Sequence, residues 1–138
     1  MYDEEYCQIQ ERAENEGCGI VEIVTHNRVE RTYIDYDIDC GPQEFLEYLS
    51  GAEYVYTDSY HGVLFSIIFN KEFVVLTKDR SRNLRIQDIL DRLCMRKTEE
   101  DYYKRDLQTD NLLKNEISNS MRFLKNCIDR RKRSETEV

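Results

Sequence analysis

The sequence predicts an α/β domain of three layers, in which helices cover both faces of a mainly parallel sheet. Short apolar runs rich in β-branched and aromatic residues alternate along the chain with segments of helical periodicity. Most candidate strands are followed by a helical segment, as connections between parallel strands require. A length of 138 residues suits one core. We therefore expect a single domain over residues 1–129, followed by a flexible charged tail over residues 130–138.

The first part of the chain predicts a helix and then one or two strands. The helix over residues 3–16 is polar and ends at Gly17, because glycine readily adopts the backbone conformation that closes a helix. A buried strand is expected over residues 19–25, where β-branched residues dominate. Residues 31–38 alternate loosely, and they are expected to form either a short extended segment or a loop.

The middle of the chain predicts a helix–strand–helix–strand order. A helix opens at Pro42, since proline is tolerated in a first helical turn, and it stops at Gly51. A strand follows over residues 53–57. Residues 63–69 are apolar on almost every side, which does not distinguish a helix from a strand. We expect a helix there, because residues 73–77 form the better strand.

Charged residues dominate the rest of the chain. Residues 78–85 are expected to form a basic loop, which carries Arg80, Arg82 and Arg85. Two helices are then expected, with a charged, irregular segment over residues 94–109 between them. The first is marked by Ile86, Ile89, Leu90 and Leu93; the second, of about five turns, is marked by Leu113, Ile117, Met121, Leu124 and Ile128. We expect the apolar stripe of the last helix to be buried.

Composition and charge exclude several classes of protein. No apolar run reaches the roughly 20 residues that span a bilayer, and no signal peptide opens the chain, so we expect a soluble, cytoplasmic protein. The net charge of −8 is the sum of 15 acidic and 3 basic residues over 1–70 and 13 acidic and 17 basic residues over 71–138. Such an acidic chain is a poor general nucleic-acid binder. Five separated cysteines predict reduced, mostly buried thiols: Cys7, Cys18, Cys40, Cys94 and Cys127.

Residues 56–62, Tyr-Thr-Asp-Ser-Tyr-His-Gly, are where we expect the chemistry of this domain. They end a strand and begin a helix, which Asp58 or Ser59 is expected to cap. Ligands bind beyond the carboxyl ends of parallel strands, and the N–H groups of residues 62 and 63 are candidates to receive an anion. Histidine is the usual side chain for proton transfer near neutral pH, so His61 is a candidate acid, base or phosphate contact. A histidine in this position is also a common capping or packing residue.

Further blocks of sequence surround this stretch in a definite order. They read Gly-Pro-x-Glu-Phe-Leu at 41–46, Thr-Asp-Ser-Tyr-His-Gly at 57–62 and Phe-Ser-Ile-Ile-Phe-Asn-Lys-Glu-Phe at 65–73. Arg-Asn-Leu-Arg-Ile-x-x-Ile-Leu follows at 82–90. From about residue 18 to residue 95, this order resembles the carboxyl-terminal half of the polysaccharide pyruvyl transferase family.

The resemblance implies transfer of a pyruvyl group from phosphoenolpyruvate to sugar hydroxyls as a ketal, in exopolysaccharide biosynthesis. It implies a Rossmann-like domain similar to one half of a GT-B-type fold. His61 would be the catalytic residue, and donor binding would fall to Ser59, Tyr60, Gly62, Arg82 and Arg85. Some members carry arginine where Ser59 stands, so we expect the arginines of 80–85 to supply that contact. Neither a metal nor a cofactor is implied beyond phosphoenolpyruvate, the donor substrate.

The family's full domain is much longer, so we expect this chain to supply only the donor-binding half and to be inactive by itself. The acceptor would be a sugar or a lipid-linked oligosaccharide. A missing N-terminal half or a homodimer partner would cover the remaining apolar surface. Two alternatives stay open. One is a non-catalytic Rossmann-like binding or interaction module; the other is half of a nucleotide-sugar glycosyltransferase, for which we identify no ribose-binding carboxylate.

Overall fold

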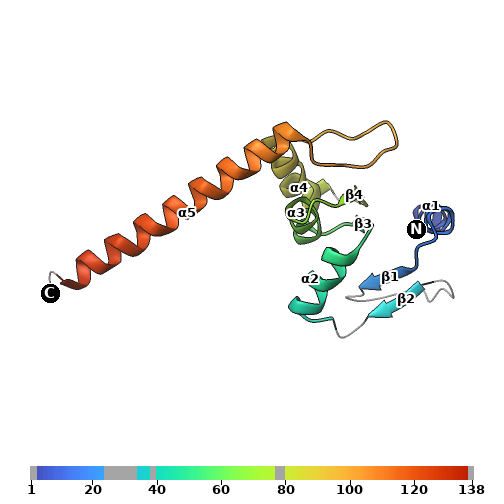
Figure 1. Ribbon diagram of the computed structural model, residues 1–138, viewed down its shortest axis with the longest axis horizontal. Coiled ribbons are helices and arrows are strands. Elements are labelled where there is room, and N and C mark those ends of the chain that lie inside the picture. Colours follow the sequence, from blue (N-terminus) through green and yellow to red (C-terminus); the bar gives the residue numbers. More distant parts are fainter. Residues whose placement is uncertain (1–2, 24–33, 38–39, 77–79, 137–138) are drawn as a thin grey trace. The chain divides into compact units, whose positions relative to one another are not determined.

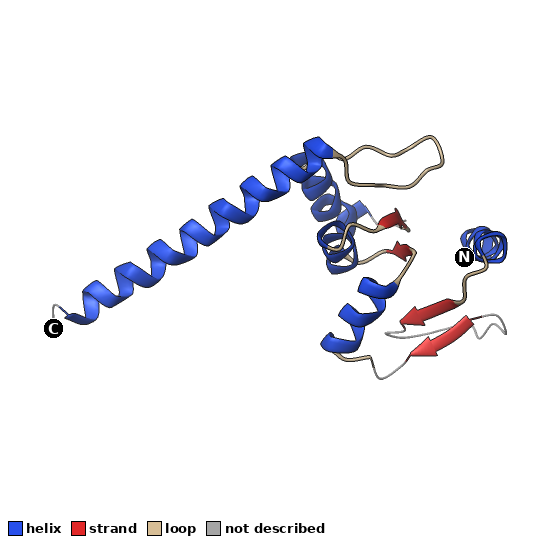
Figure 2. Ribbon diagram, viewed as in Figure 1, coloured by secondary structure: helices blue, strands red, loops and turns tan. Residues whose placement is uncertain are grey.

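The computed structural model describes the whole chain except residues 1–2, 24–33, 38–39, 77–79 and 137–138. The chain forms two compact units, Met1–Ala52 and Glu53–Val138. Helices and short strands alternate in the sequence order (Figure 1), and the strands of both described pairs run parallel (Figure 2). The predicted mixed α/β class and the parallel pairing are therefore confirmed. A single domain over residues 1–129 stays a prediction.

The first unit holds α1 (Asp3–Glu16), β1 (Ile20–Ile23), β2 (Ile34–Asp37) and α2 (Pro42–Gly51). β1 and β2 pair in parallel, with Ile20 aligned with Ile34. The segment that could be extended or a loop is thus a strand where it is described. Pro42 lies in the first turn of α2 as predicted, because this turn does not need the N–H that proline lacks. His26 lies outside the described residues.

Gly17 ends α1 as predicted. Its φ of +68° lies in the left-handed region, which glycine adopts without the steric penalty of a Cβ. The Gly17 N–H donates to the Glu14 carbonyl at 3.3 Å, and the Cys18 N–H donates to the Ala13 carbonyl at 2.8 Å. This pair of bonds is the Schellman motif, which satisfies carbonyls that the helix end would otherwise leave unbonded.

The second unit is built on a β–α–β arrangement. Strand β3 (Tyr54–Thr57) leads into helix α3 (Tyr60–Ile68), and strand β4 (Glu72–Val75) follows. β3 and β4 pair directly in parallel, with Thr57 aligned with Val75. The apolar run over residues 63–69 is therefore helical, as predicted. Val63 and Ile67 are fully buried, so α3 forms the centre of this unit's core.

Helix α4 (Arg80–Arg92) contacts α3 and begins inside the segment predicted as a basic loop. The loop prediction is wrong for residues 80–85. No glycine or proline interrupts this stretch, and arginine and leucine favour helix, so the helix extends toward the strand end. The predicted apolar face is confirmed, because Ile86, Leu90 and Leu93 are each at most 2% exposed.

Helix α5 (Leu107–Thr136) has 30 residues, about eight turns rather than five, and it includes most of the predicted tail. The Asp106 carboxylate caps it by accepting hydrogen bonds from the Thr109 N–H at 2.8 Å and the Thr109 hydroxyl at 2.9 Å. The predicted burial of its apolar stripe is wrong. Every side chain from Lys114 to Glu135 is exposed, because no other described element of the unit Glu53–Val138 covers this part of the helix.

The segment between α4 and α5 is irregular, as predicted, but it is anchored to the core. Tyr103 exchanges backbone hydrogen bonds with Phe73 at 2.8 and 3.1 Å, and the two rings stack at a centroid distance of 5.4 Å. Burial raises the pKa of the Tyr103 hydroxyl. Arg105 donates to the Ile67 carbonyl at 3.0 Å and pairs with Asp110 at 2.6 Å, which connects α3 to the start of α5.

The cysteines correct another expectation. All five are described and none forms a disulfide, but the prediction that most are buried is wrong. Cys7, Cys94 and Cys127 are exposed, because each lies on or beside a helix that presents this side to solvent.

None of the helices in the described residues has both the length and the apolar character needed to cross a membrane.

Candidate functional site

The predicted functional stretch forms a sharp elbow between β3 and α3. Ser59 is the residue that caps the helix; its backbone is extended, with φ −97° and ψ 134°, and its hydroxyl accepts a hydrogen bond from the Gly62 N–H at 3.5 Å. The Ser59 N–H in turn donates to the Thr57 hydroxyl at 3.1 Å. Of the two predicted caps, Ser59 therefore holds the turn, while Asp58 is exposed.

Gly62 permits the close approach of the helix to the strand end. A Cβ built at this position would meet the Thr57 hydroxyl at less than contact distance and would lie 2.9 Å from the Thr57 Cβ. Carbon atoms normally pack at about 3.5–4.0 Å, so no side chain fits here without displacing Thr57. Gly62 is buried, and its absence of a side chain sets how closely the elbow can close.

Two further contacts fix the elbow to the core of its unit. The Leu76 N–H donates to the Thr57 carbonyl at 2.9 Å, which continues the β3–β4 pairing to the last residue of the strand. The buried Ser66 hydroxyl donates to the Gly62 carbonyl at 2.7 Å. The backbone of residues 57–62 is therefore held from both sides, which favours a fixed position for the side chains that it presents.

His61 is one of the exposed side chains that this frame presents. It is the second residue of α3, and its ring meets the half-buried Tyr60 ring edge-on, at a centroid distance of 5.7 Å and an angle of 78°. The first hydrogen bond within the helix runs from the Val63 N–H to the Ser59 carbonyl at 3.0 Å. The N–H groups of Tyr60 and His61 precede it, so they point from the helix end together with the positive end of its dipole.

The structure corrects which N–H groups an anion would meet. The sequence indicated Gly62 and Val63, but both donate within the elbow, to the hydroxyl and the carbonyl of Ser59 respectively. A helix N-terminus of this kind receives anions through its first N–H groups. Here these belong to Tyr60 and His61, so an anion bound in this way would lie next to an imidazole.

Of the three predicted arginines, the structure describes the side chain of Arg85, and this side chain does not join the elbow. Arg85 lies on α4 with an exposed side chain, and within the described residues no hydrogen bond or ion pair joins it to residues 57–63. The backbone of residues 80–82 is helical, but the side chains of Arg80 and Arg82 lie outside the described part of the structure. His61, Ser59, Tyr60 and Gly62 are thus brought together, while Arg85 lies apart from them.

The sequence did not single out Thr57 and Ser66, which hold the elbow in place. Both leave a signal in the spacing. Thr57 comes two residues before the cap, where its hydroxyl reaches the next turn, and Ser66 follows Gly62 by four residues, the spacing at which a helical serine bonds back to a carbonyl. In the described residues there is no group of three or more His, Cys, Asp or Glu side chains that could hold a metal ion.

Comparison with known proteins identifies the family. No curated protein and no solved structure matched the chain. The family model described as polysaccharide pyruvyl transferase matches residues 2–80, more than half of the chain. The match includes the whole β3–α3 elbow and ends before Arg82 and Arg85. The chain belongs to the polysaccharide pyruvyl transferase family.

Proposed function

We propose that this chain is the donor-binding half of a pyruvyl transferase, and that the β3–α3 elbow binds the phosphate of phosphoenolpyruvate. One observation carries the proposal. The exposed imidazole of His61 stands on the first turn of α3, beside the two N–H groups that precede the helix's own hydrogen bonds. An anion held there would lie next to an imidazole, the side chain that most often serves as a general acid or base.

The proposed reaction moves the three-carbon pyruvyl unit and releases inorganic phosphate. Two hydroxyls of a sugar add to C2 of the enol phosphate to form the ketal, C3 takes up a proton to become a methyl group, and the C2–O bond to phosphate breaks. His61 is suited to one of the proton transfers or, when protonated, to holding the departing phosphate. Groups of the acceptor-binding half would bind the sugar and carry out the remaining proton transfers.

Individual residues have distinct proposed roles. His61 is the catalytic residue, and Tyr60 orients its ring through the edge-on contact at 5.7 Å. Ser59 and Gly62 shape the anion site, since they fix the first turn of α3. Arg82 and Arg85 are proposed to contact the donor carboxylate, which guanidinium groups bind through paired hydrogen bonds. Their place on α4, which packs beside α3, supports this part of the proposal.

The alternating helices and short parallel strands are compatible with a Rossmann-like half of a GT-B-type enzyme. In such an enzyme the acceptor would be bound by a second domain. We propose a sugar or lipid-linked oligosaccharide as the acceptor, in exopolysaccharide synthesis, because the family's reaction forms a ketal on sugar hydroxyls.

Amide chemical shifts during titration with phosphoenolpyruvate test the site. We expect the largest shifts at residues 59–63, the same pattern in His26→Gln, and its loss in His61→Gln. His26 is the matched control, because it is the only other histidine of the chain. Largest shifts in another part of the chain, or a pattern unchanged by His61→Gln, would contradict the assignment. The complete absence of binding would favour a non-catalytic interaction module.

A further inference from the structure

A long exposed apolar surface lies on α5. Ile117, Met121, Leu124 and Ile128 are between 52% and 63% exposed, although their type and spacing are those of a core-facing helix. Together with Leu113 they follow one another at intervals of four, four, three and four residues. At 100° per residue these five positions fall within about 80° of the helix circumference. This apolar stripe is long and narrow, the shape that suits a second helix rather than a small ligand.

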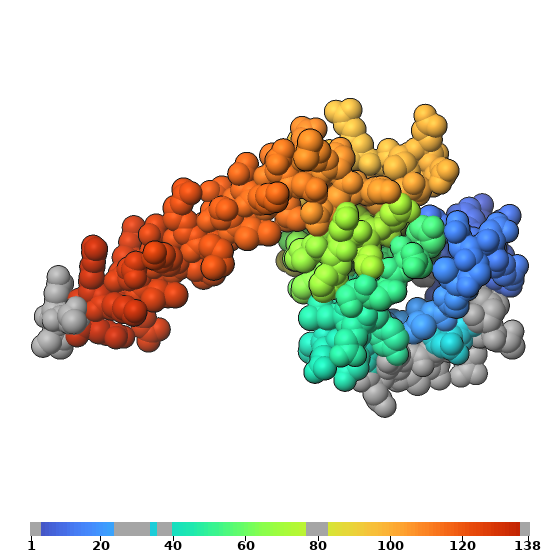
Figure 3. Space-filling model, viewed as in Figure 1, coloured from blue at the N-terminus to red at the C-terminus, as the bar shows by residue number. Residues whose placement is uncertain are grey.

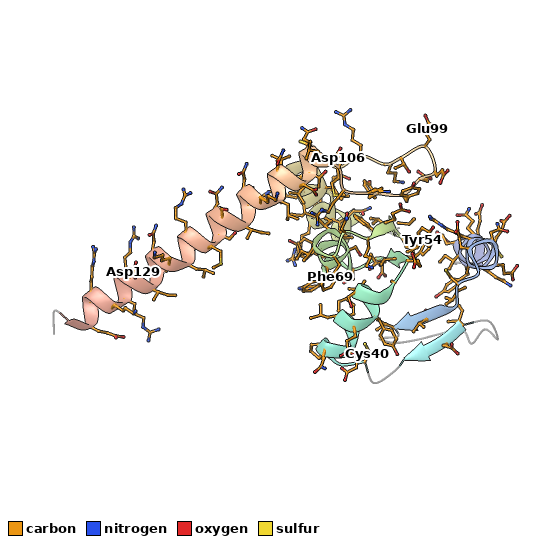
Figure 4. The ribbon with its side chains drawn as sticks, in the orientation of Figure 1. Cys40, Tyr54, Phe69, Glu99, Asp106 and Asp129 are labelled. Atoms are coloured by element: carbon orange, nitrogen blue, oxygen red, sulfur yellow. The ribbon has the colours of Figure 1, made fainter. Side chains whose placement is uncertain are left out.

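Figure 3 shows the surface of α5 in orange and red, and Figure 4 labels Asp129 on its exposed C-terminal part and Asp106 at its start. The two ends of the stripe have opposite charge. Residues 106–112 carry two acidic residues and no basic ones, a net charge of −2. Residues 129–135 carry four basic and two acidic residues, a net charge of +2.

These charges select one arrangement for a pair of such helices. When two copies run antiparallel with their stripes aligned, Ile117 lies opposite Leu124 and Asp110 lies opposite Arg131. The segment of net charge −2 on each copy then faces the segment of net charge +2 on the other. When the two helices run parallel, each charged segment faces the same segment of the other copy. Like charges then lie opposite each other, which is destabilising.

We propose that α5 is a dimerisation helix, which pairs in antiparallel orientation with α5 of a second copy of this chain through the Leu113–Ile128 stripe. The intramolecular partners of the end charges do not prevent this. Arg131 pairs with Glu135 at 3.4 Å on an exposed surface, where such pairs contribute little. Asp110 pairs with Arg105 at 2.6 Å, and the carboxylate can accept further hydrogen bonds.

A membrane surface fits the same helix less well. A helix that lies on a bilayer buries its apolar side and keeps its charged residues on the opposite face. On α5, Asp110 and Arg131 lie on the same side as the apolar stripe, at its two ends, where a bilayer would have to bury them. The chain's net charge of −8 also opposes binding to anionic lipids.

Sedimentation velocity over a range of protein concentrations tests the proposal. We expect a reversible dimer whose affinity falls about tenfold or more in Leu124→Gln, because this side chain lies at the centre of the contact. Phe123→Gln is the matched control. Phe123 is 69% exposed on the same helix but lies outside the stripe, so its replacement leaves the dimer intact. Circular dichroism checks that both variants keep the helix content of the unchanged protein.

The orientation has its own test. The double change Arg131→Glu, Lys132→Glu turns the net charge of residues 129–135 from +2 to −2. It weakens an antiparallel dimer, because acidic residues then face the acidic segment 106–112 of the other copy. It does not weaken a parallel dimer, because like charges of the same size face each other before and after the change. A monomer at all concentrations, a dimer insensitive to Leu124→Gln, or a dimer that the charge reversal does not weaken overturns the proposal. Flotation with phosphatidylserine–phosphatidylcholine vesicles by a protein that stays monomeric in solution overturns it in favour of a membrane surface.

Discussion

Replacing Gly62 by alanine tests the physical basis of the elbow. The new Cβ would lie 2.9 Å from the Thr57 Cβ and 3.1 Å from the Thr57 Cγ2, and it would be closer still to the hydroxyl. Normal contact needs about 3.5–4.0 Å, so the strand end and the helix start must separate by roughly 1 Å. Overpacking of this kind costs about 1–3 kcal/mol in a buried site.

Two further terms decide the net effect of Gly62→Ala. The movement weakens the hydrogen bond from the Ser59 N–H to the Thr57 hydroxyl, a loss of about 1 kcal/mol. Alanine favours the helix over glycine by about 1 kcal/mol, which offsets that loss. We therefore expect the overpacking term to remain, a net destabilisation of about 1–3 kcal/mol, together with weaker binding of phosphoenolpyruvate at the displaced first turn.

Urea denaturation followed by circular dichroism measures this change, and the chain offers a matched control. Gly51 also lies in a helix, but nothing lies within 4 Å of its built Cβ, so Gly51→Ala should stabilise by up to about 1 kcal/mol. Adding Thr57→Ala to Gly62→Ala should restore part of the loss, because it removes the hydroxyl and Cγ2 contacts. Equal stability gains for Gly62→Ala and Gly51→Ala would refute the close-approach argument.

Two other predictions concern the ends of α4 and α5. Cys94 has a φ of +52° just beyond the end of α4, a backbone conformation that a Cβ disfavours. Cys94→Gly should therefore raise the free energy of unfolding by about 0.5–1 kcal/mol, whereas Cys94→Ala, which keeps the Cβ, should not. Equal effects of the two changes in urea denaturation would count against this reason. The N–H and hydroxyl of Thr109 donate to the Asp106 carboxylate and lower its pKa below the ordinary value of 3.8. The carboxylate therefore stabilises the folded state above pH 3.8, and this stabilisation is lost as the pH falls through the lower pKa of the folded state. Asp106→Asn keeps a capping oxygen that does not titrate, so the unfolding temperatures of this variant and of the unchanged protein should converge below about pH 4. A difference in unfolding temperature that stays constant with pH would contradict the assigned cause.

Local patterns were enough to predict the elements that frame the site. The α/β alternation, the end of α1 at Gly17, the helical nature of residues 63–69 and the cap at Ser59 all depend on a few neighbouring residues. Such features are set by backbone conformation and by side chains that bond to nearby N–H groups. The motif at residues 57–62 likewise predicts His61 at the start of a helix, and the structure shows its side chain exposed there.

Features that depend on distant contacts were missed. The run of charges over residues 78–85 favours a loop, but helix propensity prevails and α4 starts at Arg80. Periodicity indicated that Leu124 and its neighbours need a partner, but it does not say whether the same chain supplies one. The close contact between Gly62 and Thr57, and the contact of Arg105 with the end of α3, follow from tertiary packing that no local pattern encodes.

The dissociation constant of phosphoenolpyruvate for three proteins tests the central claim most directly. Isothermal titration calorimetry at neutral pH would compare the unchanged chain, His61→Gln and His26→Gln. We expect His61→Gln to bind about tenfold more weakly, which is the loss of one charge-assisted contact, and His26→Gln to bind as the unchanged chain does. Equal affinity of all three proteins would show that the donor does not bind at the β3–α3 elbow.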